Sequence, residues 1–254
     1  MSKELNIKSS TIEKGFDLVK DFVGKLIGPT IEEVGLLFSD KIKFYRFKNQ
    51  VNILIKAKTY VQNKGINIKE IPTKILVPLL ENASLEDDSE MQDKWANMIG
   101  NLADSEQNLQ NQIFPYLLSQ VSKEEYDSLL ELSSDEEIFI EKLNEYKILK
   151  NNSETYSNKA VNLEKQIKEV QQSGFWLLLE GYEMANLQRL GLIKQLPPKI
   201  LIDGFTTSGQ LSHLGEWHQL EAEYDNEDFG YRITPLGKKF LETCEAKKPV
   251  GNIV

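Results

Sequence analysis

The chain has 254 residues, of which 40% are hydrophobic and 27% are charged, and its net charge is −9. This balance excludes intrinsic disorder over the whole chain, and the length suffices for one large domain or two modest ones. No apolar run approaches the roughly 20 residues that cross a bilayer, and the polar start MSKELNIKSS lacks the core of a signal peptide, so we expect no transmembrane segment and a cytoplasmic protein.

Charge is distributed unevenly along the chain. Met1–Leu80 carries 14 Lys+Arg against 8 Asp+Glu, Glu81–Phe175 carries 8 against 20, and Trp176–Val254 carries 8 against 11. A basic front and an acidic middle can neutralise each other within one fold or across an oligomer. A basic surface for an anionic partner is the other interpretation of the same pattern.

The first third of the chain has the periodicity of helices. Apolar residues recur at helical intervals from Ser10 to Phe38, interrupted by Gly28-Pro29, so we expect two helices there. A second pattern from Asp40 to Asn63 predicts a long helix, which Gly65 ends. Pro78 lies where the next helix would kink or restart.

The helix expected over 40–64 bears six cations that form a candidate partner-binding surface. Aromatic residues lie among them, and cations interleaved with aromatics bind nucleic acids or acidic membrane surfaces. In the alternative interpretation, which we favour, the aromatics belong to the core and the lysines are solvated or pair with the acidic middle segment. The six cations are Lys41, Lys43, Arg46, Lys48, Lys56 and Lys58.

An acidic stretch precedes the first tryptophan. Five acids stand between Glu86 and Asp93, directly before Trp95. Carboxylates at the start of a helix face unpaired backbone amides and the positive end of the helix dipole, whereas a calcium loop needs a glycine and a distal glutamate that this stretch lacks. We therefore expect a cap at Ser84 or Asp87, no metal, and Trp95 in the core.

Helical patterns continue through the middle of the chain. Ser122 and Glu125 have the spacing of a capping box, and a helix is expected over 136–150. A further helix is expected from Phe175 to Leu190, where Gly191 follows as a stop signal.

The segment over 154–172 is charged and has a thin apolar stripe made of Val161, Ile167 and Val170. Such a stripe would stay exposed in a monomer. Together with the separation of charge along the chain, it predicts self-association into a homo-oligomer.

After Pro198 the pattern changes to the alternation, glycines and aromatics of strands and a hairpin, and Thr234-Pro235 then starts a closing helix. A helix, a hairpin and a closing helix follow one another in the second half of a winged helix. We therefore predict a mostly α fold, with a helical domain over 1–172 and a winged-helix-like α+β domain over 173–254, and with strands almost entirely after Pro198.

Enzyme chemistry finds little support. The chain has no Gly-rich phosphate loop, nucleophile elbow or HExxH motif, so we expect no catalytic residues and no cofactor. His213, Glu216 and His218 form one compact group, but zinc needs three or four convergent ligands, and packing in the hairpin is the expected role. Cys244 is expected in the core of the last helix. The tail is acidic, which favours protein contact over DNA.

Three segments together resemble one protein family. The first runs from Pro78 through the acids to WANMI, the second is IFPYLLSQVSKEEYDSLLEL from Ile113 to Leu132, and the third joins NLQRLGLI from Asn186 with TPLGKKF from Thr234. They are similar to the Abi-alpha family, the abortive-infection alpha domain of bacteria. The resemblance implies a link to phage resistance and brings no catalytic residues with it.

The sequence therefore predicts a non-enzymatic interaction protein of phage defence, with a protein partner or self-association. The alternative is a nucleic-acid-binding regulator that uses the winged-helix-like tail or the basic helix over 40–64.

Overall fold

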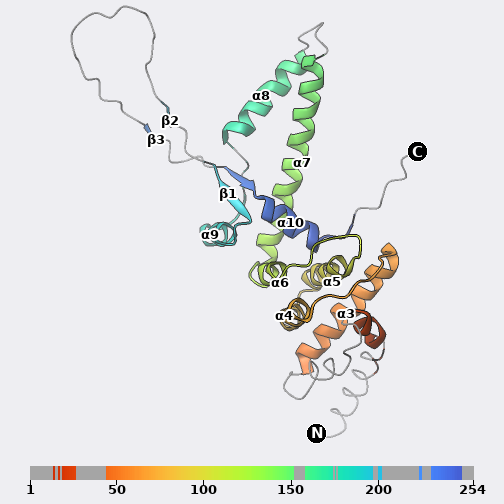
Figure 1. Cartoon of the computed structure of the whole chain (residues 1–254). Helices are drawn as coiled ribbons and strands as arrows, with labels where there is room; N and C mark the ends of the chain where they lie inside the picture. The colour runs from red at the N-terminus through yellow and green to blue at the C-terminus, as the bar shows by residue number, and fades with distance from the viewer. Residues whose placement is uncertain are drawn as a thin grey trace, which may run out of the picture. The chain divides into compact units, whose positions relative to one another are not determined.

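The computed structural model describes residues 14, 17, 19–26, 44–151, 158–173, 175, 177–196, 200–201, 223–224 and 230–247. Lys41, Lys43, His213, Glu216 and His218 lie outside these residues, as does the Gly28-Pro29 break. The described chain is mostly helical, with short strands toward its carboxyl end (Figure 1), so the predicted mostly α fold is confirmed, and the winged-helix-like character of the carboxyl-terminal segment stays a prediction.

The chain divides into two compact units. The first unit comprises Met1–Tyr126 and Pro235–Val254, and the second unit is Asp127–Thr234. The boundaries of these units differ from those of the domains expected over 1–172 and 173–254. The expected division into a helical domain and a winged-helix-like domain stays a prediction. The closing helix belongs to the first unit although it follows the strands in the chain.

The first unit is built around helices whose apolar stripes face one another. On α5, residues three or four positions apart, such as Trp95, Met98 and Leu102, are almost fully buried, as expected for one face of a helix. Each large side chain that is removed from water contributes about 1.5 to 3 kcal/mol. Besides the helical residues 19–26, the helices are α3 (Phe44–Lys64), α4 (Thr73–Ala83), α5 (Ser89–Ala103), α6 (Ile113–Leu118) and α10 (Pro235–Cys244).

Gly100 allows α3 and α5 to approach closely. A Cβ atom at Gly100 would lie 2.5 Å from Cδ1 and 2.7 Å from Cε1 of the Tyr60 ring, and 3.2 Å from a methyl group of Val61. Any side chain at this position would force the Tyr60 ring or its helix to move. Glycine is therefore required here by packing.

Helix ends follow the glycine signals, while the proline inside α4 does not end the helix. Gly65 follows α3 with φ of 61°, and Gly191 follows α9 with φ of 70°, both in the left-handed region that glycine adopts most easily. Pro78 lies within α4, which continues to Ala83. A restart at Pro78 is thus wrong, because the buried residues on both sides of Pro78 hold the helix together.

One long helix replaces the separate segments expected after Ser122. The capping box is confirmed, because the Ser122 amide donates to the Glu125 carboxylate at 2.8 Å and the Glu125 amide donates to the Ser122 hydroxyl oxygen at 3.1 Å. From there α7 (Lys123–Asn151) runs without a break, and α8 (Asn158–Ser173) lies beside it in Figure 1.

The strands of the second unit are short. Strand β1 (Ile193–Gln195) pairs antiparallel with β4 (Tyr231–Ile233), and β2 (Ile200–Leu201) pairs antiparallel with β3 (Glu223–Tyr224). Strand β1 precedes Pro198, so strands begin earlier than expected. A strand of three residues is too short to show alternation in the sequence.

The helix expected from Phe175 to Leu190 is shorter in the structure. The Phe175 amide donates to the Tyr231 carbonyl at 3.1 Å and its carbonyl accepts from the Tyr231 amide at 2.8 Å, so Phe175 pairs like a strand residue. Helix α9 is Gly181–Arg189. Phe175 is fixed by a partner far along the chain, which local periodicity does not reveal.

Candidate functional site

Two of the six candidate cations hold α3 to its neighbours. The guanidinium of Arg46 donates to the Ser84 hydroxyl at 2.9 Å and to the Glu81 carbonyl at 3.2 Å, at the end of α4. The ammonium group of Lys56 donates to the Ser89 carbonyl at 2.7 Å and lies 2.8 Å from the Asp93 carboxylate, at the start of α5. Lys56 thus pairs with a carboxylate of the acidic segment, whereas Arg46 bonds to neutral groups at the end of α4.

The other cations are not drawn together into one site by the described contacts. Lys48 is exposed on α3, and Lys58 is half-buried on the same helix. Lys41 and Lys43 lie outside the described residues. Partner binding by the six residues therefore stays a prediction.

The acidic stretch begins α5, with a cap one residue later than expected. Asp88 has an extended backbone, and its carboxylate accepts from the amides of Glu90 and Met91, both at 2.9 Å. The bond from the Met91 amide is the largest cause of the lowered Asp88 pKa. Ser84 instead donates its hydroxyl to the Glu81 carbonyl at the end of α4, so the expected caps at Ser84 or Asp87 are wrong.

Trp95 occupies the core of the first unit, as expected, with 1% of its surface exposed. Among the described residues, no three His, Cys, Asp or Glu side chains gather as a metal site would require. The stretch from Glu86 to Trp95 thus serves the start and the packing of one helix.

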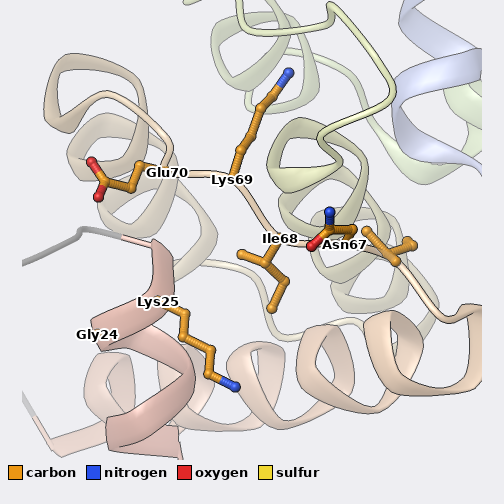
Figure 2. Close-up of a pocket in the computed structure, with 7 residues that line it drawn as sticks. Gly24, Lys25, Asn67, Ile68, Lys69 and Glu70 are labelled. Carbon is orange, nitrogen blue, oxygen red and sulfur yellow. The ribbon is translucent and has the colours of Figure 1, made fainter.

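A hollow of about 640 Å³ lies between the helical residues 19–26 and the segment 66–70. Figure 2 shows that the side chains of Lys25, Lys69 and Glu70 point away from one another. The ammonium group of Lys69 donates to the Gln107 carbonyl. The charged groups of this hollow therefore do not converge on a common point where a ligand would bind.

Polar groups do converge where α3, α5 and α10 meet. Asn101, 1% exposed, accepts from the Tyr60 hydroxyl at 2.8 Å and donates to the carbonyls of Thr243 and Glu245, both at 2.9 Å. The last carbonyls of a helix lack partners within the helix. Asn101 thus closes the end of α10 with a side chain from α5.

The segment after α10 is held by the same helices. The buried carboxylate of Asp104, at the end of α5, forms an ion pair with Lys247, and the Lys247 amide donates to the Tyr60 hydroxyl at 3.1 Å. The ammonium group of Lys64 donates to the Lys247 carbonyl at 2.8 Å. These bonds fix the chain beyond α10 across the ends of α3 and α5.

A second polar group lies beside Asn101. The Glu245 carboxylate accepts from Lys94 at 2.5 Å and from the hydroxyl of the buried Tyr126 at 2.7 Å. Burial raises the pKa of Tyr126, and the charges of Cys244 and Glu245 raise it further. Cys244 lies in the core, as expected, and its burial is the main cause of the raised pKa of its thiol.

The second unit contains a buried ion pair between aromatic rings. The Glu136 carboxylate, 4% exposed, accepts from Arg232 Nε at 2.9 Å and from the Ile233 amide at 3.0 Å. The Arg232 guanidinium lies 5.4 Å from the ring centre of Phe139 and 5.7 Å from that of Phe175, within the range of a cation–π interaction. This pair fastens β4 to α7.

The thin stripe of α8 is mostly covered. Ile167 is buried with Phe139 and Leu163 in one cluster, and Val170 packs against that cluster. Only Val161 of the predicted stripe remains half exposed, at 51%. The expectation that the stripe stays exposed in a monomer is therefore wrong for Ile167 and Val170, because α7 provides the covering surface.

These contacts join motifs that lie far apart in the chain. The WANMIGNLAD run of α5 supplies Asn101 and Asp104, and the closing helix supplies the carbonyls that Asn101 binds. A family model described as abortive infection alpha matches residues 46–244, which include these segments. The chain belongs to the abortive infection alpha family. No curated protein and no solved structure matches it.

Membership of the abortive infection alpha family links the chain to antiviral defence and phage resistance. Within the described residues, no helix combines the length and the apolar content needed to cross a bilayer. The network of Asn101, Asp104 and Lys247 was not singled out from the sequence. Its one signal is a polar residue, Asn101, beside the apolar stripe of α5.

Proposed function

We propose that this abortive infection alpha protein acts in phage defence as a non-enzymatic interaction protein of the cytoplasm, through contact with a protein partner or with a second copy of itself. The observation that carries the proposal is the exposure of large apolar side chains around the start of α9. Leu178 is 99% exposed and Tyr182 is 74% exposed.

This exposed pair suits a protein contact. A tyrosine ring offers a large, rigid contact area together with a hydroxyl group, and tyrosine is enriched at the centres of protein interfaces. Six of the nine large hydrophobic side chains that are exposed in the described part of the chain lie in the second unit. The second unit is therefore the part that we expect to meet a partner.

The polar network of the first unit supports a non-enzymatic role. The Asn101 side chain bonds to backbone carbonyls and to Tyr60. The Glu245 carboxylate accepts hydrogen bonds from Lys94 and Tyr126. A catalytic group needs access to a reacting atom. Bonds of this kind instead fix three helices relative to one another.

A nucleic-acid-binding regulator is the alternative, and α3 is the observation that favours it. Helix α3 carries five cations and no acidic residue, although Arg46, Lys56 and Lys64 already donate to neighbouring groups of the first unit. Helix α9, the counterpart of a recognition helix in the winged-helix-like segment, carries one cation, Arg189, whose guanidinium donates to the Asn186 side chain at 2.7 Å. Phosphate binding needs several clustered cations, so α3 is the better candidate for this alternative.

Site-directed photo-crosslinking tests the proposal. A photoreactive amino acid replaces Tyr182 in the full chain, and in a control it replaces Tyr116, which is 51% exposed in the first unit. We expect protein adducts at position 182 in phage-infected cells that survive nuclease treatment, and few at position 116. Adducts that disappear with nuclease would support the nucleic-acid alternative, and equal labelling at both positions would contradict a specific contact at α9.

A further inference from the structure

The solvent face of α7 in the second unit combines acids with an exposed isoleucine. Besides the buried Glu136, which pairs with Arg232, the helix carries six acids against three lysines from Asp127 to Asn151. Ile138 is 51% exposed, and Glu131 and Glu141 are exposed seven positions before it and three positions after it. Residues at these spacings share one face of a helix.

A hollow of about 260 Å³ opens beside Ile138 between α7 and α8. Phe139, Val170 and Phe175 supply apolar lining, while Asp135 and Lys142 stand on the α7 side. The hollow is large enough for one aliphatic side chain.

The solvent face of α3 in the first unit has the opposite character. Lys48 and Thr59 are exposed, and Ile55, 37% exposed, lies between them on the same face. The whole helix has no acidic residue. An isoleucine on the same face as Lys48 of α3 thus complements an isoleucine on the same face as Glu131 and Glu141 of α7.

The spacing of the two faces matches. Lys48 stands seven residues before Ile55, and Glu131 stands seven residues before Ile138. At about 1.5 Å per residue, both separations are about 10 Å along the helix axis. Two such helices that lie parallel bring lysine opposite glutamate where isoleucine meets isoleucine.

We propose that two copies of this chain associate through α3 of one copy and α7 of the other, with Ile55 entering the hollow beside Ile138 and Lys48 facing Glu131. This inference rests on the proposed function, because it names a second copy as one partner. In a closed two-fold dimer the same contact is made twice. The occupant is a second copy because the same chain supplies both members of a matched pair of faces.

Charge reversal with the purified full chain tests the contact. Lys48→Glu places two carboxylates in contact, and Glu131→Lys places two ammonium groups in contact. Each variant alone should weaken self-association on the order of tenfold or more, as measured by light scattering and sedimentation. Lys74→Glu, the same charge change at an exposed position of α4, should leave association unchanged.

Mixing the two variants separates a contact between copies from a contact within one chain. In a mixed dimer, the glutamate introduced at position 48 of one copy meets the lysine introduced at position 131 of the other. The second contact of that dimer joins the original Lys48 and Glu131, so mixed dimers should form with the affinity of the original protein. Added salt should weaken the original protein's association, because the lysine and glutamate pairs are exposed.

Three results would overturn the inference: a monomer at all concentrations, association that neither reversal weakens, or variants that mixing does not rescue. Ile138→Asp provides a stronger test if the two charge reversals change self-association too little to measure, since it places a charge at the centre of the contact. If these tests fail while position 182 still crosslinks to another protein, the proposed function stands without the dimer.

Discussion

The side-chain amide of Asn101 on α5 donates to the Thr243 carbonyl at 2.9 Å, so two residues 142 positions apart close the end of α10. The same amide donates to the Glu245 carbonyl, and its oxygen accepts from Tyr60. One buried side chain thus joins α3, α5 and the end of α10.

Replacing Asn101 should destabilise the first unit strongly. Asn101→Ala leaves buried carbonyls and the Tyr60 hydroxyl without their partner, which costs about 2 to 4 kcal/mol of unfolding free energy. Asn108→Ala, at an exposed position in the same unit, should change it by less than about 0.5 kcal/mol. Urea unfolding measures both, and equal effects would contradict the role assigned to Asn101.

A methyl group should be tolerated at one glycine and rejected at another. Gly100→Ala drives a Cβ atom into the Tyr60 ring, which two hydrogen bonds hold in place, so we expect a loss of about 1 to 3 kcal/mol. Gly181→Ala, at the start of α9, meets no atom of the described residues within 4 Å beyond its own neighbours and helix, and it should be neutral or slightly stabilising. Thermal midpoints that fall equally in both variants would refute the close approach of α3 and α5.

Stability should fall in alkali. The pKa values of Tyr126 and Cys244 are raised in the folded protein, so above the ordinary pKa values, about 8.5 for cysteine and about 10 for tyrosine, the unfolded chain releases protons that the folded chain retains. Their contribution is complete at neutral pH and is lost progressively as pH rises beyond these values. Tyr126→Phe should lower stability by about 1 to 2 kcal/mol at neutral pH, through the lost bond to Glu245, yet flatten the decline in alkali.

Unfolding free energies from pH 7 to pH 11, for the original protein, Tyr126→Phe and Cys244→Ala, check this expectation. Cys244→Ala should make the decline of the unfolding free energy less steep at the lower end of this pH range, because cysteine has the lower ordinary pKa. A decline of the same slope in all three proteins would show that other groups cause it.

We expect the residues from Glu86 to Trp95 to contribute to stability rather than to form a metal or catalytic site. Trp95→Ala removes a large buried side chain and should cost about 3 to 5 kcal/mol, so protection against phage should disappear together with folded protein. Trp95→Phe should cost less, because it keeps much of the volume and removes a buried indole N–H that has no partner in the described structure.

Changes at the cap of α5 should be mild by comparison. Asp88→Asn keeps a capping oxygen and loses only the charge, and Asp87→Asn alters no described bond of the cap. Because the Asp88 pKa is lowered in the folded state, its small contribution is present above the ordinary aspartate pKa and is lost as pH falls through the lowered value. A well-folded Asp88→Asn protein that gives no protection would defeat the structural interpretation of this stretch.

The sequence predicted correctly those features that depend on residues close together along the chain. The apolar stripe with Trp95, the capping box of Ser122 and Glu125, and the glycine stops at Gly65 and Gly191 are confirmed because each depends on neighbours along the chain. The cap at Asp88 was missed by one position, since adjacent aspartates compete and the backbone conformation chooses between them.

Long-range pairing was not predicted. Phe175 pairs with Tyr231, Arg232 with Glu136, and Asn101 with the end of α10, and each partner lies far away in sequence. Periodicity carries no information about such partners. The covered stripe at Ile167 was missed for the same reason, because its cover comes from α7.

The efficiency of phage plating on cells that carry a Leu178→Ser/Tyr182→Ala variant tests the interaction role most directly. The matched control is Leu85→Ser/Tyr116→Ala, which changes two exposed residues of the same types in the first unit. We predict that the first variant keeps the thermal midpoint of the original protein but loses protection, while the control keeps both. Full protection by the first variant, or an equal loss in the control, would contradict a contact surface at α9.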